Sequence, residues 1–529
     1  MDGLMMDRPL LVKQIAERAE AIFGDREVVA RTQDGLERSN YRGVVERSRR
    51  LASALRELGV RPGDRIASFA WSSLRHLELY LAVPSMGAVL HTLNVRLFED
   101  DLRFIVEHAA DRVLFIDSSL ADAIPRLDGP EREILMPDGP GQRTGALDYE
   151  ELVAGGDPEF QFPELGENAA AAMCYTSGTT GRPKGVLYSH RSIVLHTLGA
   201  ALPDSMGIRE HDSAMPVVPM FHALAWGIPY AAAMVGARQV LPGPDLSPDG
   251  LAELITAERV PWSAGVPTIW NGVLELDPPP DLSSLRELKA GGSAVPESLI
   301  RAFEERFGVP LVQGWGMTET SPLAATSRLP AGAELTDEEA YALRATQGRV
   351  VPLIDFRVDP EAGGELQVRG PWIARAYYGD EGDDDRFTED GWLRTGDVAE
   401  IERGAFIKLV DRTKDLVKSG GEWISSVVLE NEIMAHPDVI EAAVIAVPDE
   451  RWGERPCACV VARDGAAIDP DALRAHLDGR VAKYWIPDRF EFVDEVPKTS
   501  VGKFDKKLLR ERFARNPLTV GSESNGPRS

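Results

Sequence analysis

The chain has 529 residues, which is too long for one ordinary domain and predicts two or more compact units. Hydrophobic residues make up 43% and charged residues 27%, a balance that excludes disordered and membrane-embedded classes. A formal net charge of −26 argues against nucleic acid as a partner, because phosphate binding needs a basic surface.

The first 160 residues alternate helix-like and strand-like segments, and the pattern resumes from residue 170 to about residue 312. Strands that alternate with helices at this spacing predict a mostly parallel α/β core. The predicted helices cover residues 41–58, 73–83 and 99–108, and the predicted strands cover residues 64–70, 88–93 and 112–117.

The pattern changes twice in the second half of the chain. Residues 348–410 have short strand-like runs between glycine-rich turns and predict a small β-barrel-like subdomain. After Asp411 a new βα unit begins. We therefore predict a large amino-terminal domain over residues 1–410, a small α+β domain over residues 411–515, and a polar disordered tail over residues 516–529.

Cysteine usage and the apolar stretches bear on the compartment. Cys174, Cys457 and Cys459 form no C-x-x-C pair, so we expect neither a disulfide framework nor a zinc site, and a cytoplasmic protein fits. The first ten residues lack the basic start and apolar core of a signal peptide. Residues 215–237 are apolar but contain three prolines and His222, which predicts a pocket wall rather than a membrane span.

The segment from Tyr175 to Gly185 reads Y-T-S-G-T-T-G-R-P-K-G and directly follows a predicted strand. Small residues and hydroxyls let backbone N–H groups surround an anion, and Lys184 adds a positive charge. It is not a Walker A loop, because Lys184 is followed by glycine rather than serine or threonine. The predicted phosphate-contacting residues are Thr176, Ser177, Gly178, Thr179, Thr180, Gly181 and Lys184.

This segment resembles the phosphate loop of the adenylate-forming superfamily, which contains acyl-CoA synthetases, peptide-synthetase adenylation domains and firefly luciferase. The family's other landmarks occur in order over residues 10–512. The resemblance implies an amino-terminal domain that binds AMP and the acyl group, and a mobile carboxy-terminal domain. It also implies an enzyme that uses ATP, Mg²⁺ and coenzyme A to convert a carboxylic acid to acyl-AMP and then to a thioester.

The segment Gly314-Trp-Gly-Met-Thr-Glu319 places a carboxylate after an aromatic residue. Near a phosphate loop one carboxylate can hold Mg²⁺, which usually takes one or two protein carboxylates plus phosphates. The resemblance implies that Glu319 binds Mg²⁺ and that Thr318 contacts the phosphate. It also implies that Trp315 stacks on adenine, although the family more often has tyrosine there. Further implied nucleotide contacts are Gly292, Ser293, Ala294, Gly314 and Gly316.

Three segments near the carboxy-terminus complete the resemblance. An aspartate at a turn is often only a turn former, but the family assigns the ribose hydroxyls to Asp397, assisted by Arg412. The matching Lys503 would reach across the domain boundary to stabilise the adenylation transition state, in which two anions approach each other. Between the half-reactions the small domain would rotate. The implied hinge is Lys414, and the implied thiol-step loop contains Lys418, Gly420 and Gly421.

The acyl substrate is suggested by the segment Val217–Trp226, which resembles that of bacterial medium- and long-chain fatty acyl-CoA synthetases. No charged side chain occurs in residues 265–269 or 291–295, so an uncharged hydrophobic acid fits better than an amino acid. The implied acyl pocket contains Val218, His222, Trp226, Gly265 and Gly292.

Several alternatives stay open at this point. The product could pass to a carrier protein instead of coenzyme A, or the acid could be aromatic or polycyclic. From a different class, the chain could be a non-catalytic adenylate-binding protein. The resemblance also implies a homodimer.

Overall fold

The computed structural model describes residues 1, 3–176, 182–380, 385–420, 422–449, 451–463, 465–466, 468–498 and 504–515. The chain falls into two compact units. The first contains Met1–Thr395 and Glu400–Lys408, and the second contains Gly396–Ala399 and the chain from Leu409 onward. The predicted boundary after residue 410 lies close to this division, except that the short segment 396–399 belongs to the second unit.

The first of two large sheets in unit 1 has seven strands in the order β7-β6-β5-β3-β4-β8-β9, of which β9 alone is antiparallel. The predicted α/β core is therefore confirmed. The strands are β3 Arg65–Phe69, β4 Val89–Thr92, β5 Asp111–Asp117, β6 Arg132–Met136, β7 Leu147–Asp148, β8 Ala170–Tyr175 and β9 Gly185–Ser189.

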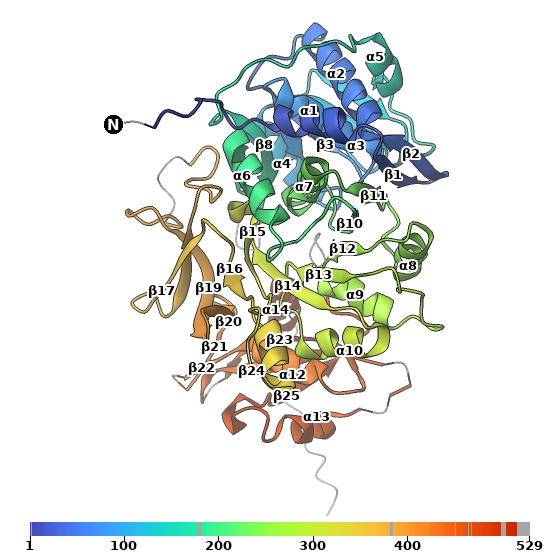
Figure 1. Cartoon of the computed structure of the whole chain (residues 1–529). Coiled ribbons are helices and arrows are strands. Elements are labelled where there is room, and N and C mark those ends of the chain that lie inside the picture. Colours follow the sequence, from blue (N-terminus) through green and yellow to red (C-terminus); the bar gives the residue numbers. More distant parts are fainter. Residues whose placement is uncertain are drawn as a thin grey trace, which may run out of the picture. The chain divides into compact units, whose positions relative to one another are not determined.

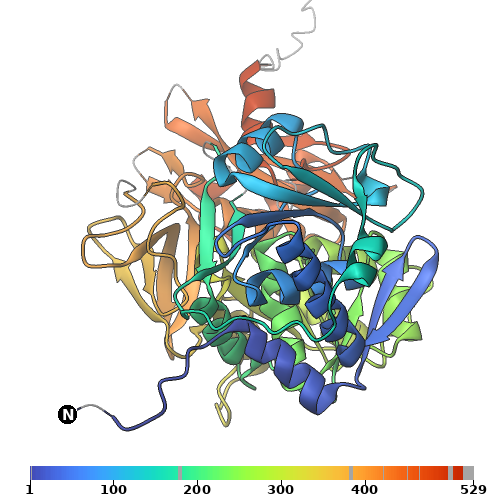
Figure 2. The ribbon, with the colours of Figure 1, turned by 90° about the horizontal axis from the view of Figure 1, so that it is seen from above.

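The helices beside this sheet begin where local capping signals stand in the sequence. Asn40 accepts a hydrogen bond from the Gly43 N–H at the start of α2 (Tyr41–Glu57), and Ser73 does the same for the His76 N–H at the start of α3 (Leu74–Ser85). Both helices pack against α1 (Val12–Phe23) (Figure 1, Figure 2). Helices α4 (Glu99–Ala109) and α5 (Tyr149–Gly155) complete this part.

The second large sheet has nine strands in the order β16-β15-β14-β13-β12-β10-β11-β1-β2. Its central strands are parallel, and β2, β15 and β16 are antiparallel additions at the edges. One face carries Met215, Leu288 and Leu311, which pack with residues of α8, α9 and α10 (Figure 1). The strands are β1 Glu27–Thr32, β2 Gly35–Asn40, β10 Ser213–Pro216, β11 Arg238–Leu241, β12 Trp262–Gly265, β13 Glu287–Gly291, β14 Leu311–Gly316, β15 Leu323–Thr326 and β16 Arg349–Val350; the helices are α6 His190–Ala201, α7 Ile228–Val235, α8 Pro248–Ala257, α9 Pro267–Leu274, α10 Glu297–Phe307 and α11 Asp337–Arg344.

Two smaller sheets follow. The region predicted to be all-β contains a four-stranded sheet of β17 (Asp355–Asp359), β18 (Glu365–Arg369), β19 (Leu393–Glu402) and β20 (Phe406–Arg412). Unit 2 contains a five-stranded sheet in the order β22-β21-β24-β23, in which β25 also pairs with β24. Its elements are β21 Val417–Ser419, β22 Glu422–Ile424, α12 Ser426–Met434, β23 Val439–Asp449, β24 Gly453–Ala462, α13 Pro470–Leu477, β25 Arg489–Phe492 and α14 Lys506–Arg515.

The positions of the three cysteines and the lengths of the helices bear on two of the sequence predictions. Cys457 and Cys459 lie on one buried face of β24, as their spacing predicts, and neither they nor Cys174 forms a disulfide. Within the described part of the chain, no helix combines the length and apolar character needed to cross a bilayer.

Three histidines buried in unit 1 make its stability sensitive to acid. A ring nitrogen of His190 accepts the Val12 N–H, and a ring nitrogen of His196 accepts the Leu323 N–H, so both rings are neutral at these contacts. Burial lowers the pKa of His76 and of His190 to about 4 and that of His196 to about 3.

We therefore expect the melting temperature to fall as the pH is lowered from 7 to 5. The unfolded chain takes up protons below pH of about 6.5 while the native histidines stay neutral, so each one costs about 1.4 kcal/mol of unfolding free energy per pH unit. Circular dichroism melts at several pH values measure the slope. His196→Gln should reduce it, whereas a change at the exposed His211 should not. A melting temperature that is constant over this range would contradict the expectation.

Candidate active site

The expected phosphate loop connects two antiparallel strands, β8 and β9. At its ends the Thr176 N–H donates to the Lys184 carbonyl at 2.9 Å, and the Lys184 N–H donates to Thr176 Oγ1 at 3.2 Å. The two outer residues of the predicted loop are therefore held together. The loop residues Ser177, Gly178, Thr179, Thr180 and Gly181 lie outside the described residues.

A tyrosine that the sequence analysis missed joins the loop to the predicted metal ligand. The Lys184 Nζ lies 4.7 Å from the centre of the Tyr377 ring, a cation–π contact. The Tyr377 hydroxyl donates to Glu319 Oε1 at 2.5 Å. The structure thus brings Lys184 and Glu319 to one side chain, Lys184 over its ring and Glu319 at its hydroxyl. No local signal in the segment around Tyr377 marks this role, because the partners lie far away in sequence.

Glu319 is fixed by its backbone as well as by Tyr377. It lies in the 3₁₀ turn η3 (Thr318–Thr320) directly after β14, and its side chain is almost fully buried. The Tyr188 hydroxyl donates to the Thr318 carbonyl at 2.8 Å, and the Ala374 N–H donates to the Glu319 carbonyl at 2.8 Å. Gly316 is required here, because a Cβ would lie 1.7 Å from the Pro322 carbonyl oxygen.

The donor set at Glu319 fits Mg²⁺. That ion usually takes one or two protein carboxylates and completes its shell with phosphate oxygens and water. A buried carboxylate beside a phosphate loop matches this pattern. Over the described ranges of the chain, no group of three or more histidine, cysteine, aspartate or glutamate side chains forms a separate metal cluster.

The predicted adenine-side residues lie together at the carboxyl ends of two neighbouring parallel strands. Gly291 at the end of β13 pairs with Gly314 in β14, and a Cβ on Gly291 would lie 2.7 Å from the Gly314 carbonyl oxygen. Gly292 follows with a φ of +85°, and Ser293 is exposed. This edge of an open α/β sheet is where ligands usually bind. Ala294, Trp315 and Gly316 belong to the same edge.

The predicted acyl residues come from the next strands of the same sheet edge. The Val218 N–H donates to the Ala264 carbonyl, next to Gly265 at the end of β12. His222 and Trp226 are partly exposed. The four residues 223–226 all have left-handed φ angles of 42° to 56°, a costly conformation for residues other than glycine that is often found at functional sites. The tip of the Trp226 ring lies 3.2 Å from where a Gly291 Cβ would stand.

Unit 2 contains the predicted ribose-binding pair. The Arg412 Nε lies 2.6 Å from Asp397 Oδ1, and Asp397 is 2% exposed. The structure therefore brings the two predicted residues together at a buried carboxylate.

The implied thiol-step loop and the segment of the predicted catalytic lysine are described in part. Gly420 has a φ of +60°, and a Cβ there would lie 2.8 Å from the Trp452 ring, so glycine is required. The Lys418 Nζ lies 5.3 Å from the Trp423 ring centre. Lys414 stands in the turn after β20. Gly421 and Lys503 lie outside the described residues, but a bridge between Lys498 and Phe504 joins the two ends of the segment that contains Lys503.

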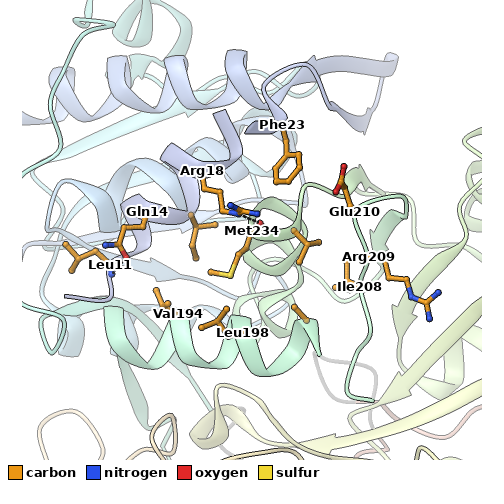
Figure 3. A pocket seen from close by; sticks show the side chains of 13 residues that line it. Leu11, Gln14, Arg18, Phe23, Val194, Leu198, Ile208, Arg209, Glu210 and Met234 are labelled. Atoms are coloured by element: carbon orange, nitrogen blue, oxygen red, sulfur yellow. Dashed lines mark hydrogen bonds between the residues drawn. The ribbon is translucent and has the colours of Figure 1, made fainter. Parts of the chain in front are cut away.

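A separate cavity of about 590 Å³ lies among α1, α6 and α7 (Figure 3). Its wall is mainly apolar, and Arg18 within it donates to the Met234 carbonyl at 2.9 Å. None of the predicted site residues lines it. The cavity is therefore distinct from the sheet edge described above.

Comparison with known proteins gives concordant matches. A family model described as AMP-binding enzyme matches residues 16–378, and one described as AMP-binding enzyme C-terminal domain matches residues 428–503. The chain is 46% identical to a long-chain-fatty-acid–CoA ligase of Thermus thermophilus over 96% of both chains. It is 43% identical to 3-methylmercaptopropionyl-CoA ligase of Ruegeria pomeroyi, over 98% of this chain and 100% of that one. The solved structure of ATP-bound MatB from Rhodopseudomonas palustris is similar with a TM-score of 0.82 at 27% identity, covering 95% of this chain and 99% of that one.

Proposed function

The chain belongs to the AMP-binding enzyme family and is an AMP-forming acid–thiol ligase, and on this premise we propose that it activates a hydrophobic carboxylic acid for transfer to coenzyme A. In the first half-reaction the acid's carboxylate attacks the α-phosphate of ATP and releases pyrophosphate. In the second, the thiol of coenzyme A attacks the acyl carbonyl and AMP leaves.

One observation supports this assignment above the others. Lys184 lies over the Tyr377 ring and Glu319 accepts from the Tyr377 hydroxyl, so a cation and a buried carboxylate meet at one side chain beside the expected phosphate loop. The cation would neutralise phosphate charge, and the carboxylate would hold Mg²⁺, which withdraws electron density from the phosphates when it is bound with ATP. Tyr377 keeps both groups in place by one cation–π contact and one hydrogen bond.

The remaining residues have complementary roles in the proposal. Trp315 would stack on adenine, and Asp397 with Arg412 would bind the ribose hydroxyls. Thr318 would contact the phosphate. Lys503 would supply the cation that the adenylation transition state needs, because a carboxylate and a phosphate approach each other there.

We place the acid beside His222 and Trp226, at the carboxyl ends of β10, β12 and β13. The surrounding segments 265–269 and 291–295 contain no charged side chain, which favours an apolar acid. The two relatives named above differ widely in the size of their acids, because one takes a long-chain fatty acid and the other 3-methylmercaptopropionate. Chain length must therefore be decided from this chain's own residues.

A panel of carboxylic acids tests the proposed function. Pyrophosphate should be released with apolar acids and not with amino acids, and a thioester and AMP should form when coenzyme A is added. Acyl-AMP that accumulates despite coenzyme A would instead favour a carrier protein as the acceptor. ADP as the nucleotide product would contradict the proposal.

A further inference from the structure

A buried lysine lies close to the proposed acyl site. Lys289 in β13 is 2% exposed, and its Nζ lies 3.0 Å from Glu287 Oε1 and donates to the Ser205 carbonyl at 3.1 Å. Glu287 is also paired with Arg328 at 2.8 Å. The three side chains therefore form an interior cluster that contains two cations and one anion. Burial lowers the pKa of Lys289 to about 8, which leaves it charged at neutral pH.

The cluster lies on the same face of β13 as the proposed acyl contacts. Leu288 and Ala290 point to the opposite face, where they pack with residues of α8, α9 and α10. Side chains alternate along a strand, so Lys289 and Gly291 share the other face and are about 7 Å apart. The Trp226 ring covers Gly291 on that face at 3.2 Å. Lys289 is thus one row of side chains further inside than Trp226.

Helix α6 and the segment that follows it lie over this face. The His196 ring of α6 accepts the Leu323 N–H and lies 2.7 Å from where a Cβ on Gly227 would stand. Ser205, which holds the Lys289 ammonium group, comes four residues after the end of α6. Gly227, next to Trp226, therefore lies beside α6, and Lys289 lies beside the segment that follows this helix.

We infer that Lys289 closes the inner end of the acyl site, so that the enzyme prefers acids of short or medium length. The inference rests on the proposed function. A longer chain that passes Trp226 must displace the ammonium group from Glu287 and Ser205. Breaking a buried ion pair weakens binding about a hundredfold or more, whereas each additional buried methylene strengthens it only about fourfold. Two or three additional methylenes, which together strengthen binding about 16- to 60-fold, therefore do not offset that loss.

The test compares Lys289→Met with the unchanged enzyme. Methionine keeps most of the side-chain volume without the charge, and Glu287 retains Arg328 as its partner. Pyrophosphate release gives kcat/KM for straight-chain saturated acids from butanoic to hexadecanoic acid. For the unchanged enzyme, kcat/KM should decline for acids longer than the medium-chain acids. In the variant, the ratio of kcat/KM for hexadecanoic acid to kcat/KM for butanoic acid should be about tenfold or more higher than in the unchanged enzyme.

Two further variants sharpen the result. Lys13→Met removes another buried lysine of unit 1, one paired with Glu164, and should leave the chain-length profile unchanged. Lys289→Arg keeps the charge and should keep the preference for shorter acids. It also provides a test if Lys289→Met does not fold.

Each contrary outcome is distinct. If the unchanged enzyme uses hexadecanoic acid as well as octanoic acid, Lys289 does not close the site. An unchanged profile in a folded Lys289→Met variant would overturn the inference as well. A preference of the unchanged enzyme for acids with a distal carboxylate would also overturn the inference, because Lys289 would then bind the substrate instead of closing the site. Absence of AMP formation with every acid would instead refute the proposed function.

Discussion

Replacement of Lys503 by alanine is expected to slow acyl-AMP formation about a thousandfold. A unit charge about 4 Å from the developing charge contributes about 4 kcal/mol at an effective dielectric constant of about 20, and that energy corresponds to about a thousandfold in rate. Thioester formation from supplied acyl-AMP needs no attack on a phosphate, so it should be retained.

The two half-reactions must be measured separately for this comparison. Pyrophosphate release with acid and ATP reports the first, and thioester formation from synthetic acyl-AMP and coenzyme A reports the second. Lys507→Ala is a suitable control, because Lys507 is an exposed lysine four residues further along the chain. Equal losses of both half-reactions in the Lys503→Ala variant would show that this lysine has no step-specific role.

Replacement of Lys414 by proline is expected to have the opposite effect. Lys414 lies in a turn in which the Asp415 and Leu416 N–H groups both donate to the Arg412 carbonyl. Proline locks φ and restricts the preceding residue, so the backbone could no longer change conformation there. If this turn is the hinge between the half-reactions, acyl-AMP formation should persist. Thioester formation should fall about a hundredfold, the usual effect of misplacing reacting groups.

The variant Lys414→Ala distinguishes the effect of a locked backbone from the effect of losing the Lys414 charge. Alanine removes the ammonium group but leaves the backbone free to rotate, so both half-reactions should stay near their original rates. Rapid-quench measurement of acyl-AMP and thioester in the same reaction gives both rates at once. Loss of acyl-AMP formation in the proline variant would contradict the proposed alternation.

The secondary structure of unit 1 was largely predictable from the sequence, because its signals are local. The helix predicted over residues 41–58 is observed as α2, with Asn40 as its cap. The strand predicted over residues 112–117 is observed as β5, Asp111–Asp117. Apolar periodicity and capping residues act over a few neighbouring positions, so a short window of sequence contains them.

The candidate site was predictable where its chemistry is concentrated in short segments. The Gly- and Thr-rich loop before Lys184 and the segment that ends at Glu319 each combine residue types that a phosphate or a metal requires. Gly316 stands in the second of these segments and Gly420 in the predicted thiol-step loop, but the sequence did not show what either glycine approaches in space.

Only the tertiary structure decided which distant residues meet. Tyr377 reaches Glu319 across 58 residues of chain and also contacts Lys184, and Lys289 meets Ser205 across 84. The segment 396–399, with Asp397, belongs to the second unit and not to the first. These pairings follow from how strands and helices pack, and packing depends on the shape of the whole core rather than on any local pattern. The sequence by itself therefore determined the type of chemistry, and the fold decided which side chains hold the candidate residues in place.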